Sequence, residues 1–228
     1  MTDSSRRNAA KFDAYAEDYT RLHANNVSVS GEEPDYFASY KVDCLERKGV
    51  QRSEHILDFG CGVGNVTAKL AERFQNVAGY EPSPASAEKA RARVPSAVIH
   101  HDIAALPDAT FDVAVLSCVL HHVPPSERPR LLEQLLQKLR RGGRLFVFEH
   151  NPFNPVTRYA VATCEFDDDA VLLWPWEAKR LLSDNGFTGV NLDYIVFFPK
   201  PLAFLRGLEP RLSWLPAGAQ QLLVGTKA

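Results

Sequence analysis

From residue 54 onward, short apolar runs alternate with stretches in which apolar residues recur at the spacing of a helix face. The runs predict strands over residues 55–59, 76–81, 97–101, 111–117 and 144–149, and the periodic stretches predict helices over 67–74, 85–94 and 126–140. Gly142 and Gly143 are expected to end the last of these helices. Beyond residue 150 a less regular pattern predicts a helix over 176–187 and strands over 190–198 and 219–227. Strands that alternate with helices are typical of a mainly parallel sheet.

Two further helices are expected before this region. Aromatic and apolar side chains recur at helical spacing over residues 7–23, and again from Pro34, which suits a first helical turn, until Gly49. We therefore expect an N-terminal helical cap over residues 1–50, followed by a single α/β domain over residues 51–228.

The composition is that of an ordinary globular protein, with 45% of the 228 residues apolar and 24% charged. A formal net charge of -2 provides no general attraction for a polyanion, so nucleic acid is not expected as a partner. The first residues are polar, and no window is apolar enough for a signal peptide or a membrane span, which predicts a cytoplasmic protein. The four cysteines form no C-x-x-C pair, so neither a zinc knuckle nor a disulfide framework is indicated.

A glycine-rich stretch, HILDFGCGVGNVT, follows directly on the first predicted strand. Gly60, Gly62 and Gly64 lie two residues apart, whereas dinucleotide-binding enzymes use the spacing G-x-G-x-x-G. Missing Cβ atoms allow a ligand to touch the backbone at the start of the next helix. Asp58 on the strand would repel a pyrophosphate and attract a positively charged ligand, so the stretch favours a cationic ligand.

The stretch resembles the first motif of the class I S-adenosylmethionine-dependent methyltransferases, in which an apolar pair precedes D-x-G-x-G-x-G. Ile56 and Leu57 match the pair, and Asp58 with the three glycines matches the rest. The resemblance covers residues 54–150 well. It implies a Rossmann-like seven-strand sheet in the order 3-2-1-4-5-7-6 with one antiparallel strand, and S-adenosylmethionine as the cofactor.

Further cofactor-binding residues are implied by the same resemblance. Glu81, followed by Pro82, matches the acid that ends the second strand and holds both ribose hydroxyls. Asp102 matches a third acid, beside the adenine amino group, and Ile103 would flank the adenine ring. An ionised carboxylate only accepts hydrogen bonds, which suits both of these partners. Acids at successive strand ends lie along one edge of a parallel sheet, where such folds bind ligands.

The methionine half of the cofactor is expected near the end of the fourth strand. Ser117 and His122 lie there, and both are candidate cofactor contacts. In related small-molecule methyltransferases, a tyrosine of an N-terminal Y-x-x-x-Y helix reaches the methionine carboxylate, a role that Tyr19 would fill here. Alternatively, Tyr15 and Tyr19 only pack this helix onto the domain.

Methyl transfer from a sulfonium requires mainly placement and desolvation, and it leaves S-adenosylhomocysteine. An oxygen acceptor also benefits from a base, for which His150, His122 and His23 are the candidates, with His150 preferred because it ends the fifth strand. The [ND]-P-P-[YF] motif of many amino-group methyltransferases is absent. We therefore expect O-methylation of a small organic acceptor, with transfer to carbon or nitrogen less favoured.

Two other functions and a metal site compete with this interpretation. A nicotinamide-dependent oxidoreductase would need the last glycine one position later. A non-catalytic protein that holds S-adenosylmethionine as a sensor or scaffold is not excluded by any residue. The acidic run over residues 165–170 is interpreted as a solvated loop, so no metal is expected. The oligomeric state is not predicted.

Overall fold

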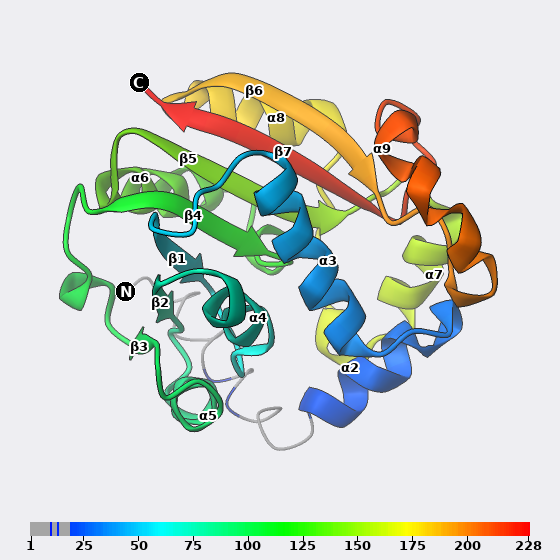
Figure 1. Cartoon of the computed structure of the whole chain (residues 1–228), viewed down its shortest axis with the longest axis horizontal. Coiled ribbons are helices and arrows are strands. Elements are labelled where there is room, and N and C mark those ends of the chain that lie inside the picture. Colours follow the sequence, from blue (N-terminus) through cyan, green and yellow to red (C-terminus); the bar gives the residue numbers. More distant parts are fainter. Residues whose placement is uncertain (1–9, 11–12, 14–18) are drawn as a thin grey trace.

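Seven strands form one sheet in the order β3-β2-β1-β4-β5-β7-β6 (Figure 1), in a computed structural model that describes residues 10, 13 and 19–228. The strands are β1 (His55–Phe59), β2 (Asn76–Tyr80), β3 (Val98–His100), β4 (Phe111–Ser117), β5 (Leu139–His150), β6 (Phe187–Ile195) and β7 (Gln220–Lys227). Strand β7 runs antiparallel to both of its neighbours, and the other neighbouring strands are parallel. The expected strand order and the single reversed strand are confirmed.

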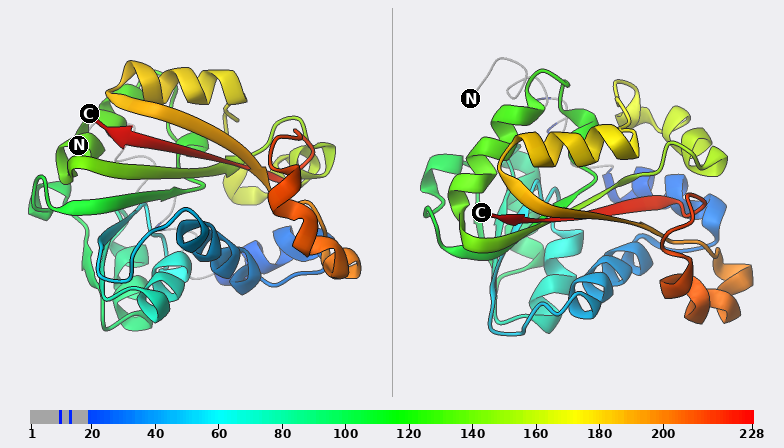
Figure 2. Two further views of the ribbon diagram at one scale, coloured as in Figure 1. Left: turned by 45° about the horizontal axis from the view of Figure 1, so that its top comes forward. Right: turned by 90° about the horizontal axis from the view of Figure 1, so that it is seen from above.

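Helices cover both faces of this sheet (Figure 2). The α-helices in the described part of the chain are α2 (Tyr19–Val27), α3 (Pro34–Arg47), α4 (Asn65–Arg73), α5 (Pro84–Arg93), α6 (Arg128–Lys138), α7 (Pro155–Ala162), α8 (Pro175–Asp184) and α9 (Glu209–Leu212). Short 3-10 helices include η2 (Ile103–Ala105), η3 (Leu120–His122), η4 (Glu165–Asp167) and η5 (Lys200–Leu208). None of the helices described here is long and apolar enough to cross a membrane.

The alternation of side chains along β1 explains why the sheet needs both helical layers. Ile56 packs with Leu45 of α3 and Leu70 of α4, whereas Leu57 packs with Leu132 of α6 in a second cluster that includes α8. Parallel strands buried on both faces are mostly apolar, and the buried parts of β1 and β4 are apolar except for one aspartate each, Asp58 and Asp112. Asp58 interrupts the apolar sequence of β1, which places a carboxyl group inside the protein on the face of α3 and α4.

Some element boundaries differ from the sequence-based predictions. The helix expected over 126–140 ends at Lys138, because Leu139 already pairs with Phe111 of β4, and Gly142 and Gly143 lie within β5 rather than at a helix end. The strand expected over 190–198 ends at Ile195, because Val196 has a positive φ of 60° and cannot continue it. Helices α7, η5 and α9 lie in stretches for which no helix was predicted.

Candidate functional site

A cavity of about 970 Å³ opens at the carboxyl ends of β1, β2, β4 and β5. It brings together most of the site residues expected from the sequence: Asp58, Gly60, Gly62, Glu81, Pro82, Asp102, Ile103, Ser117, His122 and His150. Gly64 is not among the lining residues. The expectations for Tyr15, and for the side chains of Tyr19 and His23, lie outside the described part of the structure. Residues from four separate strand ends therefore share one space, as the strand order predicts.

The second and third glycines of the loop meet different structural needs. A Cβ atom built on Gly62, which has φ of 54°, would meet no atom within 4 Å. At Gly64, with φ of 85°, it would lie 3.1 Å from the Cα of Ala90 in α5. Gly62 therefore leaves room at the cavity wall, while Gly64 allows α4 and α5 to pack closely. The contact with Ala90 gives Gly64 a packing role, and its expected contact with a ligand stays a prediction.

Asp58 is a buried carboxyl group with unused hydrogen-bonding capacity. Its Oδ2 accepts a hydrogen bond of 2.7 Å from Thr67 Oγ1, whereas its Oδ1 accepts none. Burial raises the pKa of Asp58 to about 6. A charged or hydrogen-bonding ligand in the cavity would supply the missing partner.

Glu81 connects the end of β2 to the glycine loop. Its Oε2 accepts a hydrogen bond of 2.8 Å from the backbone N–H of Gly62, and its Oε1 accepts one of 2.9 Å from Ser83. Burial raises the pKa of Glu81 to about 7, against the opposing effect of these two bonds. Asp102, in contrast, is exposed, and its Oδ1 accepts from the N–H of Ala104 at 3.0 Å. The two acids differ in burial although both line the cavity.

The raised pKa of Glu81 predicts that nucleoside binding depends on pH. Ribose hydroxyls donate to an ionised carboxylate, so below pH 7 binding must drive a proton off Glu81. We expect the affinity for adenosine to fall by up to about tenfold per pH unit below pH 7 and to be constant above pH 8. Calorimetry with adenosine from pH 6 to 8.5 measures this, because adenosine lacks the amino acid part of the cofactor. Glu81→Gln should remove the dependence of adenosine affinity on pH. If the affinity of that variant falls with pH as steeply as that of the wild type, Glu81 is not the ribose contact.

Lys41 is a buried cation at the cavity that was not predicted from the sequence. It lies in α3 with 7% of its surface exposed, and its Nζ donates a hydrogen bond of 2.7 Å to Ser117 Oγ. Cys118 follows with φ of 58°, and its Sγ lies 3.7 Å from the same Nζ. Because Lys41 shares a helix face with Phe37 and Leu45, a charge on an apolar face was the available sequence signal.

His121 and Glu149 form a fully buried pair at the cavity, with His121 among the residues that line it. Glu149 Oε2 lies 2.6 Å from His121 Nδ1, and Glu149 Oε1 accepts from the backbone N–H groups of Leu120 at 2.7 Å and Val119 at 3.1 Å. Although burial opposes it, the adjacent histidine lowers the pKa of Glu149 to about 2, and the two acids nearby raise the pKa of His121 to about 10. Neither residue was assigned a role from the sequence, although an acid inside an apolar strand was a usable signal.

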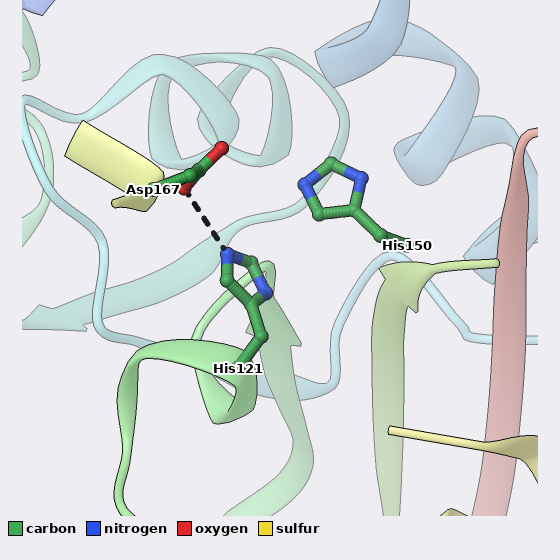
Figure 3. A group of neighbouring side chains, drawn as sticks. All are labelled: His121, His150 and Asp167. Atoms are coloured by element: carbon green, nitrogen blue, oxygen red, sulfur yellow. Dashed lines mark ion pairs between the residues drawn. The ribbon is translucent and has the colours of Figure 1, made fainter. Parts of the chain in front are cut away.

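Asp167 brings a second carboxyl group to these histidines (Figure 3). Its Oδ1 lies 3.5 Å from His121 Nε2 and 3.3 Å from His122 Nε2, and the residue is 4% exposed. The interpretation of residues 165–170 as a solvated charge run is therefore wrong for Asp167, which η4 turns into the protein. Nearby histidines lower the pKa of Asp167 to about 2 despite its burial.

The ring of His150 faces the same space as His121 and Asp167 (Figure 3). The ring centroids of His121 and His150 are 4.9 Å apart, and those of His121 and His122 are 4.1 Å apart. Burial and the neighbouring His121 lower the pKa of His150 to about 4 and that of His122 to about 3. Two of the three histidines predicted as catalytic thus lie at one end of the cavity, together with His121.

The fold is Rossmann-like, and its cavity has the glycine loop and Glu81 at one end and a histidine cluster at the other. Comparison with known proteins narrows this class. Residues 57–147 match the family described as a methyltransferase domain. That segment includes the glycine loop, and the matches support a class I S-adenosylmethionine-dependent methyltransferase with S-adenosylmethionine as its cofactor.

Curated relatives match parts of the chain. A carboxy-S-adenosyl-L-methionine synthase of Dichelobacter nodosus is 34% identical over 109 residues, which are 44% of this chain and 46% of that protein. An uncharacterized methyltransferase of a Geobacillus species is 30% identical over 149 residues, which are 62% of this chain and 66% of that protein. The chain therefore spans less than half of the first relative and just under two thirds of the second.

Solved structures share the fold over most of the chain. A methyltransferase of Thermotoga maritima, described as a possible histamine N-methyltransferase, has a TM-score of 0.71 at 21% identity, covering 97% of this chain and 100% of its own. Magnesium protoporphyrin IX methyltransferase of Synechocystis, with bound S-adenosylmethionine, has a TM-score of 0.66 at 17% identity, covering 100% and 99%. Identities this low establish the architecture alone, and the two named acceptors differ.

Proposed function

We propose that this protein transfers a methyl group from S-adenosylmethionine to an oxygen atom of a small organic acceptor. The observation that carries the proposal is the continuity of the cavity, which extends from the glycine loop and Glu81 to His121, His150 and Asp167. Its volume of about 970 Å³ lies at the upper end of the usual range for small-molecule pockets. Donor and acceptor would thus share one enclosure.

The donor would occupy the end of the cavity formed by the glycine loop. In this arrangement Glu81 accepts hydrogen bonds from the ribose hydroxyls, with Pro82 beside it, and Asp102 accepts from the adenine amino group next to Ile103. The buried and unpartnered Oδ1 of Asp58 supports a nearby ligand that is positively charged or donates hydrogen bonds.

The methionine half of the donor would then extend toward the end of β4. Ser117 and His122 line the cavity there, which supports their predicted contacts with this half. Helix α2, which contains Tyr19 and His23 and whose Asn26 and Val27 line the cavity, would lie beside the donor in this proposal.

The acceptor would occupy the histidine end. Its oxygen uses a lone pair to form a bond to the methyl carbon, while the carbon–sulfur bond breaks and its electron pair stays on sulfur. The products are the methylated oxygen compound and S-adenosylhomocysteine, and the proton of the acceptor hydroxyl leaves to a base. His150 supports this role by its position, because it ends β5 and faces the cavity.

Transfer of tritium from S-[methyl-³H]adenosylmethionine to a panel of phenols, alcohols, carboxylic acids and amines tests the proposal. We expect labelled product from oxygen acceptors and S-adenosylhomocysteine in equal amount. A calorimetric titration with NAD serves as the control and should show no binding. Label in amines alone would contradict the oxygen preference, and tight donor binding without turnover on any acceptor would support a sensor or scaffold instead.

A further inference from the structure

We propose that His121, His150 and Asp167 bind one divalent transition-metal ion, with Zn²⁺ as the representative ion. The three side chains come from η3, the end of β5 and η4, and they surround a common space (Figure 3). All three line the cavity, so an ion held between them would be accessible from it.

The spacing of the donor atoms suits a small ion. One atom of each residue lies within 4.8 Å of the others, and His121 Nε2 is 3.5 Å from Asp167 Oδ1. Ligands of a tetrahedral zinc ion lie roughly 3.3 Å apart, given metal–ligand bonds of about 2.0–2.1 Å. The pair of His121 and Asp167 already has this separation, and His150 needs only a small approach.

Asp167 has no hydrogen bond that would explain its burial. It is 4% exposed, and neither carboxylate oxygen accepts a hydrogen bond. The contacts to His121 Nε2 and His122 Nε2, at 3.5 and 3.3 Å, are too long for strong hydrogen bonds. A buried carboxylate without hydrogen bonds is costly, and a bound metal ion would take over from the proton on His121 as the compensating charge and would also fill the carboxylate lone pairs.

Glu149 orients His121 in the way expected for a metal ligand. Its Oε2 lies 2.6 Å from His121 Nδ1, so that ring nitrogen keeps its hydrogen, and Nε2, which faces Asp167, is the atom that would bind the ion in exchange for its proton. A carboxylate that accepts from the second ring nitrogen is a common feature behind metal-binding histidines. The two backbone N–H groups bonded to Glu149 Oε1 fix the carboxylate in turn.

The donor set determines which ions fit. Two imidazoles and one carboxylate suit zinc, iron and related transition metals, while magnesium and calcium prefer oxygen ligands. Three protein ligands leave a coordination position free, as in catalytic zinc sites. With this ion bound, His150 acts as a ligand and not as a base.

The use of the ion in methyl transfer rests on the proposed function, although its binding does not. An acceptor hydroxyl bound to the free position would lose its proton to water, because a metal ion lowers the pKa of a coordinated hydroxyl. The resulting oxygen anion attacks the methyl carbon as the carbon–sulfur bond breaks, giving S-adenosylhomocysteine and the methylated oxygen. The proton released to water completes the balance.

Metal binding is tested on the tag-free protein without donor or acceptor. The chelated protein is dialysed against Zn²⁺, and bound zinc is counted by elemental analysis; Co²⁺ then reports the ligand field by visible absorption. We expect one ion per chain in the wild type, and at least tenfold weaker binding in Asp167→Asn and in His150→Ala. His55→Ala, which removes an exposed histidine at the start of β1, is the matched control and should bind like the wild type.

Two results would overturn the site: no stoichiometric zinc in the wild type, or equal zinc in wild type, Asp167→Asn and His150→Ala. Far-ultraviolet circular dichroism shows whether each variant is folded, and the conservative Asp167→Asn keeps the shape of the side chain. Zinc binding without methyl transfer would contradict the proposed function and leave the metal site intact. Methyl transfer by a chelated protein that does not bind zinc would contradict the metal site and leave the proposed function intact.

Discussion

Glu81→Ala is expected to weaken the binding of S-adenosylmethionine by about 2–4 kcal/mol, because two hydrogen bonds to a charged group are lost. In dissociation constants this is about 30- to 1,000-fold. The same carboxylate also accepts from Gly62 and Ser83, so the substitution loosens the loop that faces the ligand. Calorimetry at pH 8, where Glu81 is ionised in the wild type, measures the loss.

Two further variants separate this effect from a general loss of structure. Glu88→Ala removes an exposed carboxylate from α5, close in sequence but outside the cavity, and should bind like the wild type. Glu81→Gln keeps one acceptor oxygen, so its affinity for S-adenosylmethionine should lie between those of the wild type and Glu81→Ala. Wild-type affinity in Glu81→Ala would refute the assignment of the ribose contact.

The second large effect concerns stability. Glu149→Ala is expected to lower the free energy of unfolding by about 3–5 kcal/mol, since it leaves His121 and two backbone N–H groups buried without their acceptor. The loss is large relative to the total stability of a typical domain. Urea unfolding at pH 7, followed by circular dichroism, provides the measurement.

A milder variant keeps this prediction testable if the alanine variant unfolds. Glu149→Gln retains an oxygen for Leu120 and Val119 and loses only the charged partner of His121, so a smaller loss of about 1–3 kcal/mol is expected. Glu133→Ala on the exposed side of α6 is the control, with a change within about 0.5 kcal/mol. Equal stability of the Glu149→Ala variant and this control would show that the buried pair contributes nothing.

Local sequence patterns predicted the features that depend on strand periodicity. Strands β1, β2 and β4 begin and end within a few residues of their predicted limits, because each is a short apolar run with turn residues on both sides. Asp58 and Glu81 could be placed at one edge of the sheet for the same reason. Successive parallel strands are joined by right-handed crossovers, so their carboxyl ends lie at the same edge of the sheet. This position can be predicted without knowledge of any side-chain contact.

Contacts between distant segments were not predictable in this way. Asp167 reaches His121 only because η4 folds back over the end of β4, and no local pattern encodes that approach. Lys41 meets Ser117 because α3 packs across the sheet. Gly64 matches the glycine motif, yet its conformation and its contact with Ala90 show that helix packing requires it.

The position of β7 has a consequence for the way this protein is made. This strand comes last along the sequence but is inserted between β5 and β6, and its Gln220 is part of the cavity wall. Until it has left the ribosome, β5 and β6 each expose an unpaired edge, which is a site for association with other chains. The nascent polypeptide is therefore most prone to association with other chains after β6 has formed and before β7 pairs with it, and chaperone protection matters most in that interval.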